Sequence, residues 1–115
     1  MSDAATGTHV PDVIARYHEA HDRQDTDKAL SAFAPDATVV DEDRAFRGVD
    51  AIHEWLESAG REYTYTRTFV GAQHLDDDTW VIHNRLEGNF PGRVAELHYR
   101  YRIANGLIAE LVIAP

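Results

Sequence analysis

The sequence predicts an α+β domain in which three N-terminal helices pack in the concave face of one curved, mostly antiparallel sheet. Two observations carry this prediction. Apolar residues recur at steps of three and four up to about residue 60, which is the period of an amphipathic helix. From about residue 62 the period falls to two and turn signals recur, which is typical of strands joined by hairpins. Helices followed by a run of strands define the α+β class.

The first helix is predicted over about residues 10–24. Pro11 suits its first turn, where the missing N–H of proline costs no hydrogen bond. Residues 1–9 are small and polar, so we expect a flexible extension ahead of a single domain over residues 10–115. The apolar stripe of the helix is predicted to consist of Val10, Val13, Ile14, Tyr17 and His21.

A second, shorter helix is expected to begin at the cluster 25–27, whose side chains can cap its first turn. Leu30 and Phe33 lie on its apolar face. The helix ends before Pro35, because the residue that precedes a proline avoids helical angles. Residues 37–41 are then predicted to form the first strand.

A charged loop is expected to lead through Phe46 and Gly48 into a third helix. Gly60 is expected to end this helix, because glycine is common just beyond a helix C-terminus. The inward stripe of the helix is predicted to consist of Ile52, Trp55, Leu56 and Ala59.

Four strands are expected in the second half of the chain. Asn105-Gly106 is the strongest two-residue hairpin signal between them. Short turns make neighbouring strands antiparallel, and long strands twist strongly, so the sheet should curl around the helices. The four segments run over about residues 62–74, 79–90, 93–104 and 107–113.

Alternation along these strands predicts which side chains face the helices. In the segment 93–104, Tyr99 faces inward with apolar neighbours, whereas His98 faces outward among charged residues. The outer face therefore carries mixed charge, which suits either solvent or a symmetric dimer contact. In the segment 79–90, the inward set is Trp80, Ile82, Asn84 and Leu86.

Composition excludes several classes of function. Twenty acidic against eleven basic residues give a net charge of -9, which repels phosphate backbones and anionic membranes, so we expect neither nucleic acid nor a membrane as a partner. The absence of cysteine excludes disulfides and thiolate chemistry. The first residues lack the basic start and apolar run of a secretory signal, so we expect a cytoplasmic protein.

Tyr17 and Asp41 are the residues best placed to carry chemistry. Tyr17 lies on an apolar stripe, so its phenol is either a core residue with a satisfied hydroxyl or a hydrogen-bond donor aimed into a cavity. Asp41 ends the first strand, and both faces of that strand are partly apolar. Its carboxylate is therefore either solvated or directed into the interior. The pattern of residues leaves these alternatives open.

Other inward side chains complete a possible pocket. The amide of Asn84 needs hydrogen-bond partners, which backbone, water or a ligand can supply. His21 is either a satisfied core histidine or an acid or base in the pocket. The side chains that would wall a pocket, or only fill the core, are Trp55, Trp80, Phe33 and Phe46.

No metal site is predicted. The segment His18-Glu19-Ala20-His21 is one residue shorter than the His-Glu-x-x-His pattern of zinc helices, and no third ligand is placed by the sequence. The sequence also lacks a phosphate-cradling glycine loop. We therefore expect no metal and no cofactor.

The stretch from Arg16 to Asp41 resembles the opening of ketosteroid isomerases and of the wider SnoaL-like, nuclear transport factor 2-like superfamily. The shared parts are Arg16-Tyr17, a Phe-Ala-x-Asp-Ala-Thr-Val run over 33–39, and an aspartate two residues beyond that valine. Similarity continues over 46–52 and 90–108, so it covers nearly the whole chain. The resemblance implies a cone-shaped fold with a small, mainly apolar pocket.

The resemblance also implies roles for individual residues. Asp41 matches the general base of the isomerases, and Tyr17 matches the tyrosine that stabilises the developing enolate oxygen. The isomerases complete this oxyanion hole with a protonated aspartate. Here that place falls on Tyr99 if inward parity is kept, or on His98 if the distance to the turn is kept. Parity favours Tyr99, because the other register would bury unpaired arginines.

These assignments lead to a functional hypothesis. The protein is expected to be a cofactor-free isomerase, cyclase or dehydratase that moves a proton within a small apolar organic ligand, with Asp41 as base and Tyr17 and Tyr99 as donors. The alternative is a non-catalytic ligand-binding or dimeric assembly domain of the same fold. The resemblance favours a homodimer formed through the outer sheet face.

Overall fold

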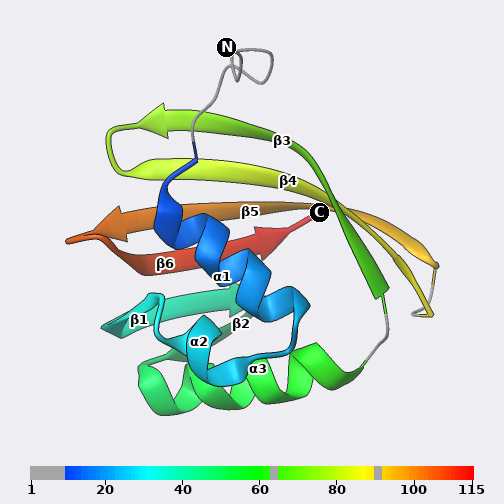
Figure 1. The fold of residues 1–115 in the computed structure, drawn as a ribbon, viewed down its shortest axis with the longest axis horizontal. Coiled ribbons are helices and arrows are strands. Elements are labelled where there is room, and N and C mark those ends of the chain that lie inside the picture. Colours follow the sequence, from blue (N-terminus) through cyan, green and yellow to red (C-terminus); the bar gives the residue numbers. More distant parts are fainter. Residues whose placement is uncertain (1–9, 63–64, 90–91) are drawn as a thin grey trace.

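The computed structural model describes residues 10–62, 65–89 and 92–115 (Figure 1). The flexible extension predicted over residues 1–9 lies outside these ranges. Within them, none of the helices has the length and apolar character needed to cross a bilayer. The elements in chain order are α1 (Asp12–Asp22), α2 (Thr26–Leu30), β1 (Phe33–Asp41), β2 (Arg44–Arg47), α3 (Val49–Glu62), β3 (Tyr65–Asp76), β4 (Thr79–Gly88), β5 (Val94–Ala104) and β6 (Leu107–Ala114).

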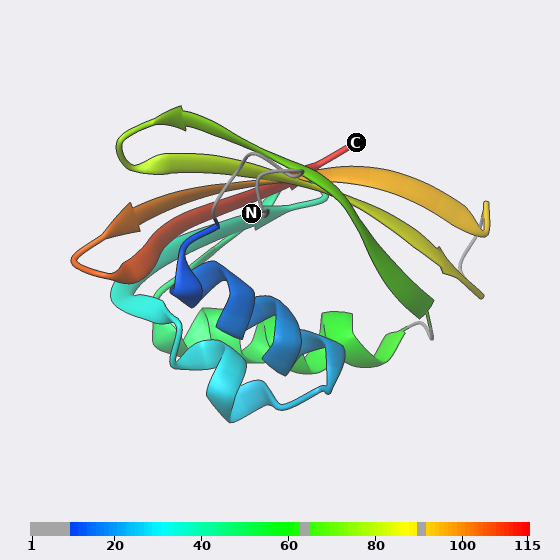
Figure 2. The ribbon, with the colours of Figure 1, turned by 45° about the horizontal axis from the view of Figure 1, so that its top comes forward.

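The strands form one six-stranded sheet in the order β2-β1-β6-β5-β4-β3. The pair β1–β6 is parallel, and the other four neighbouring pairs are antiparallel. The sheet curves, and the three helices lie on its concave side (Figure 2). These features confirm the predicted α+β class and the curved, mostly antiparallel sheet.

Helix α1 is rotated slightly from the predicted stripe. Tyr17 is 1% exposed, as expected, but His18 is also buried, whereas His21 is only half-buried. The helix begins after Pro11, whose carbonyl accepts a hydrogen bond of 3.1 Å from the amide of Ile14. His18 therefore belongs to the core of the domain, which the sequence analysis did not predict.

The prediction that Phe33 belongs to the second helix was wrong. Helix α2 is capped by Asp25 as expected, but it ends at Leu30, and Phe33 begins β1. Phe33 is paired with Ile108 of β6, whose amide donates to the carbonyl of Ala32 at 2.8 Å. This pairing draws the chain out of the helix before Pro35 is reached. The strand accommodates the proline because its register shifts between Phe33 and Thr38.

Two other boundaries also differ from prediction. The segment 44–47, expected to be loop, forms β2 as a hairpin with β1. Glu42 and Asp43 make the turn with φ of 53° and 63°, which is the conformation that Asn-Gly pairs normally provide. Helix α3 continues through Gly60 to Glu62, because an interior glycine weakens a helix without always ending it.

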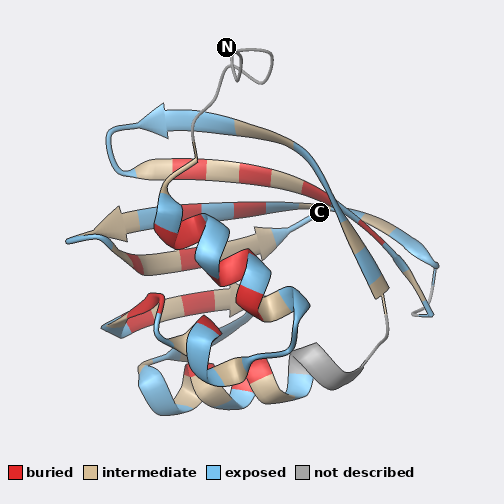
Figure 3. Cartoon of the chain, viewed as in Figure 1, coloured by how far each residue is buried: buried red, intermediate tan, exposed pale blue. Residues whose placement is uncertain are grey.

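The predicted alternation in β4 and β5 is confirmed. Tyr99 and Tyr101 are 7% and 0% exposed, and His98, which precedes Tyr99, faces outward and is exposed. Figure 3 shows buried residues alternating with more exposed ones along these strands, and a buried stripe along α1. In β4 the buried residues are Trp80, Ile82, Asn84 and Leu86, as predicted.

Candidate functional site

The carboxylate of Asp41 lies on the helix side of the sheet. Asp41 is the last residue of β1, where it is paired with Arg44 on one side and Ile113 on the other. Its Oδ2 accepts a hydrogen bond of 3.0 Å from Nε1 of Trp55 in α3. Trp55 is 4% exposed and Asp41 is half-buried. The indole therefore holds this half-buried carboxylate on the helix side of the sheet.

Two phenols approach the same region from α1 and β5. Tyr17 is 1% exposed and Tyr99 is 7% exposed. Burial raises the pKa of both hydroxyls well above the ordinary value, and the charge of Asp41 raises both further. The carboxylate is thus within electrostatic range of both phenols. Each phenol stays protonated near neutral pH and remains able to donate a hydrogen bond.

The predicted inward amide, Asn84, is 0% exposed and belongs to a network that sequence reasoning missed. Its Oδ1 accepts a hydrogen bond of 3.0 Å from Nη1 of Arg67 in β3. Arg67 in turn donates from Nε and Nη2 to the carboxylate of Asp22 at the end of α1, at 2.9 and 2.6 Å. The position of Arg67 among aromatic residues on one face of β3 was the available signal for this network.

His18 and Tyr101 form a second buried polar contact that the sequence analysis missed. The hydroxyl of Tyr101 lies 2.7 Å from Nε2 of His18. Burial lowers the pKa of His18 well below its usual value, so its ring is neutral near pH 7, and burial raises the pKa of Tyr101. The inward parity of Tyr101 was the available signal, because a buried hydroxyl needs a partner.

Aromatic rings surround these polar groups. The ring of Tyr17 meets Phe33 edge to face at 5.3 Å between centroids. His21 and Phe46 both lie beside Trp55, at 6.3 Å each. Burial lowers the pKa of His21, which favours its neutral form. The structure therefore brings together His21 and three of the four predicted wall residues.

Trp80 is the exception among the predicted walls. It is 9% exposed and belongs to the core. Its ring stacks on His74 of the neighbouring strand, with centroids 3.9 Å apart. Among the described residues, Trp80 stacks on His74 and does not join the rings that meet Trp55.

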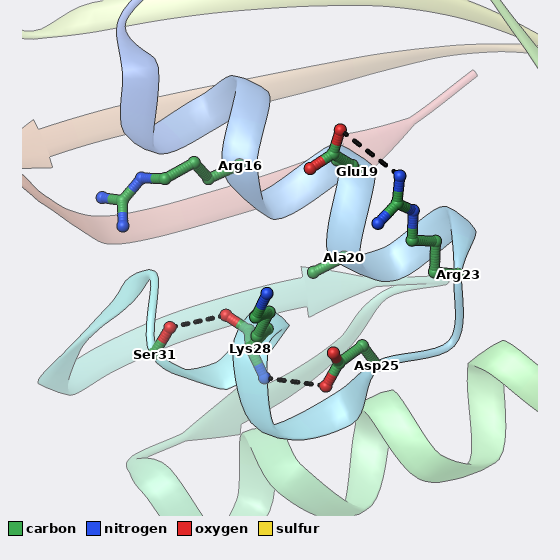
Figure 4. Close-up of a pocket in the computed structure, with 7 residues that line it drawn as sticks. All are labelled: Arg16, Glu19, Ala20, Arg23, Asp25, Lys28 and Ser31. Carbon is green, nitrogen blue, oxygen red and sulfur yellow. Dashed lines mark hydrogen bonds and ion pairs between the residues drawn. The ribbon is translucent and has the colours of Figure 1, made fainter.

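A separate hollow of about 230 Å³ lies between α1 and α2. Figure 4 shows that its charged side chains largely pair with each other or with backbone, as in the 3.9 Å contact of Glu19 with Arg23. None of the predicted site residues lines it. The lining consists of Arg16, Glu19, Ala20, Arg23, Asp25, Lys28 and Ser31.

The fold places a curved sheet over three helices, with one carboxylate and several phenols between the layers, which defines a SnoaL-like class of domain. The family model of the SnoaL-like domain matches residues 14–111, and the chain belongs to that family. The predicted resemblance is therefore confirmed. No protein of curated function matches the chain by sequence.

Solved structures agree with this assignment. A Sinorhizobium meliloti protein, provisionally named a polyketide cyclase, is 34% identical with a TM-score of 0.86, over 91% of this chain and 95% of that one. A Catenulispora acidiphila protein with a ketosteroid isomerase-like fold, in complex with trimethylamine, is 17% identical with a TM-score of 0.81, over 93% and 87%. SalBIII, an epoxide hydrolase/cyclase-like enzyme of salinomycin pyran ring formation, is 17% identical with a TM-score of 0.76, over 89% and 86%.

Proposed function

We propose that this protein is a cofactor-free enzyme that moves a proton within a small, mainly apolar carbonyl compound. Asp41 is the base, and Tyr17 and Tyr99 are the hydrogen-bond donors to the carbonyl oxygen. The observation that carries this proposal is the carboxylate of Asp41, held by the Trp55 indole at 3.0 Å within electrostatic range of two buried, protonated phenols.

The proposed step is proton abstraction from the carbon next to the carbonyl. Asp41 takes the proton, and the electron pair of the C–H bond moves onto the carbonyl oxygen to form an enolate. Tyr17 and Tyr99 stabilise that oxygen by hydrogen bonds that strengthen as charge develops. Where the substrate has a carbon–carbon double bond conjugated with the enolate, the protonated Asp41 then returns the proton to the far carbon of that double bond, and the double bond shifts as the carbonyl re-forms. Alternatively, the enolate attacks an electrophile within the same molecule. The first outcome is isomerisation and the second is aldol-type cyclisation, from which dehydration can follow.

The surroundings support this chemistry. Trp55 donates a hydrogen bond to the carboxylate and so holds it in place on the helix side of the sheet. The aromatic rings of Phe33, Phe46 and Trp55 give the site apolar surroundings, in which electrostatic interactions with the enolate oxygen are stronger than in water. Related structures support the class of reaction, because the Sinorhizobium meliloti protein carries the name of a cyclase and SalBIII is named for ring formation.

We also propose that the protein forms a homodimer through the outer face of the sheet. That face carries charges of both signs, and His83 stacks on His98 at 4.5 Å with its Nε2 3.4 Å from a carboxylate oxygen of Glu96. A two-fold axis can pair such a face with itself. Arg100 is an exposed residue of β5 on this outer face. Sedimentation should give the mass of two chains for the wild type and of one chain for Arg100→Glu, which reverses the charge there. A wild type that sediments as one chain would contradict the proposal.

The catalytic proposal is tested by hydrogen–deuterium exchange of a bicyclic ketone, decalin-1-one, in D2O. The wild type should accelerate exchange at the carbon next to the carbonyl, as followed by NMR. Asp41→Asn should lose about a hundred- to ten-thousand-fold of this acceleration, the usual contribution of a general base. The variant should still bind the ketone, because asparagine keeps the size of the side chain.

Asp36→Asn is the matched control. Asp36 lies in the same strand as Asp41 but is exposed, so its exchange rate should equal that of the wild type. Exchange by the wild type at the rate of buffer, or equal exchange by Asp41→Asn and the wild type, would contradict catalysis. Retained ketone binding with no exchange would instead support the non-catalytic ligand-binding alternative.

A further inference from the structure

The side-chain amide of Asn84 has a defined orientation. Its Oδ1 faces Nη1 of Arg67 at 3.0 Å. An arginine side chain has donors only, so the opposite orientation of the amide would place N–H against N–H. Arg67 therefore fixes the acceptor end of Asn84 toward itself and turns the donor end, Nδ2, away.

This donor end is buried and unpaired. Asn84 is 0% exposed, and Nδ2 has no hydrogen-bond partner among the residues that the structure describes. An unsatisfied buried donor is costly, so groups of this kind normally meet protein, water or a ligand. The charge of Arg67 on the other end of the amide also polarises Nδ2 and makes it a stronger donor. Nδ2 can therefore donate a hydrogen bond to an acceptor oxygen of a ligand.

The local charges favour a neutral acceptor over an anion. The positive charge of Arg67 is balanced by Asp22, whose carboxylate receives hydrogen bonds from two of its nitrogens. Burial lowers the pKa values of His18 and His21, so both are neutral near pH 7. Asp22 and Asp41 bring two carboxylates to this region for the one guanidinium of Arg67, and this excess of acidic groups opposes a carboxylate ligand. A ketone or ester carbonyl meets no such opposition.

The Asn84 amide and the Tyr17 phenol are held at different positions along α1. Asp22, which holds Arg67, is the last residue of α1 and lies five residues beyond Tyr17. Five residues rise about 7 Å along a helix axis. Asn84 is therefore anchored toward one end of α1, whereas Tyr17 projects from nearer its middle. This offset suits a ligand that offers two separate oxygens.

We propose that Asn84, oriented by Arg67 and Asp22, binds a second, neutral carbonyl oxygen of the substrate, so that the substrates are neutral compounds with two separated carbonyl groups. The inference rests on the proposed function for the identity of the first carbonyl. Arg67 and Asp22 act as positioning residues, because they reach the ligand only through the amide. Asn84 determines specificity and contributes to binding rather than to proton abstraction.

The test compares matched ligands by NMR titration of the protein. The ligands are decalin-1,5-dione, decalin-1-one and 5-oxodecalin-1-carboxylate. The wild type should bind the diketone about tenfold more tightly than the monoketone, which corresponds to one added hydrogen bond. It should bind the keto acid more weakly than the diketone.

Asn84→Asp is the informative variant, because it keeps an acceptor toward Arg67 and removes the donor. Its affinity for the monoketone should be retained, and the tenfold preference for the diketone should disappear. Asn105→Asp, which adds the same charge in the exposed β5–β6 turn, should keep the preference. Asp22→Asn tests the charge argument independently: it should raise affinity for the keto acid relative to the diketone, because Arg67 is no longer neutralised.

Several outcomes would overturn the inference. These are equal affinity of the wild type for diketone and monoketone, an unchanged preference in Asn84→Asp, or no binding of any of the three ligands. The preference is a binding measurement, so it is also expected in Asp41→Asn. If the wild type prefers the diketone but does not accelerate proton exchange, the proposed function is refuted and the Asn84 subsite is retained. If exchange depends on Asp41 but the diketone is not preferred, the proposed function is supported and the Asn84 subsite is refuted.

Discussion

Two groups of buried polar residues lie under α1, and they differ in how their hydrogen bonds are satisfied. In the first, His18 and Tyr101 contact each other at 2.7 Å, and both side chains are buried. In the second, Asp41 is held by Trp55 but remains half-buried, and the neighbouring phenols of Tyr17 and Tyr99 are within range of its charge. The first group is a closed pair, whereas we propose that the second, the Asp41 site, binds a ligand.

The two groups are expected to contribute differently to stability and to function. A closed pair stabilises the fold because each partner satisfies the other, so loss of one partner leaves a buried polar group unpaired. A site that keeps donors and a carboxylate for a ligand contributes less to stability and more to chemistry. Variants of the two groups should therefore change different measured quantities.

After Asp41→Asn, the largest expected effect belongs to Tyr17→Phe. Loss of its hydroxyl removes one donor to the enolate oxygen, which should slow decalin-1-one exchange about a hundred- to a thousand-fold. The free energy of unfolding should change little, because the ring and its contact with Phe33 remain. Exchange kinetics and urea unfolding of the same preparation measure both quantities. Exchange at the wild-type rate would remove Tyr17 from the proposed oxyanion hole.

Tyr101→Phe should show the opposite behaviour. The substitution leaves Nε2 of His18 without its partner, so the free energy of unfolding should fall by about 1–3 kcal/mol. Exchange by the folded protein should stay within a few-fold of the wild type. The measurement is urea unfolding, with exchange assayed well below the transition. A thousand-fold loss of exchange with normal stability would show that the pair takes part in the chemistry.

A smaller effect concerns the pH dependence of stability. Burial depresses the pKa of His18 in the folded state, so the unfolded chain takes up more protons as the pH falls below about 6.5. Stability should therefore be complete above that pH and decrease toward acid, by at most about 1.4 kcal/mol per pH unit from this residue. His18→Gln cannot titrate and should flatten the decrease. The part contributed by His21, whose pKa is also lowered by burial, should remain.

Urea unfolding at a series of pH values from neutral to mildly acidic measures this effect. A wild type and a His18→Gln variant with parallel pH dependence would show that His18 does not govern acid lability.

Local sequence patterns predicted the parts of the site that depend on strand parity. Alternation placed Asn84 and Tyr99 inward and His98 outward, and the structure agrees. Helical spacing placed Tyr17 inward for the same reason. These predictions need only the period of a helix or a strand, together with the tendency of apolar residues to share one face.

Features that depend on pairing between distant segments could not be predicted. Arg67 meets a carboxylate 45 residues earlier, and no local pattern specifies that contact. Phe33 left the helix predicted for it because a strand from the end of the chain pairs with it. The β1–β2 hairpin was missed because Glu42 and Asp43 adopt positive φ without glycine or asparagine.

The most direct test of the central claim is a crystal structure with 2-naphthol, a flat aromatic alcohol whose oxygen resembles that of an enolate. The naphthol oxygen should lie within about 2.5–3.0 Å of the hydroxyls of both Tyr17 and Tyr99. The carboxylate of Asp41 should lie over the adjacent ring carbon while still bonded to Trp55. Binding in the hollow between α1 and α2, or an oxygen bound away from both phenols, would contradict the account.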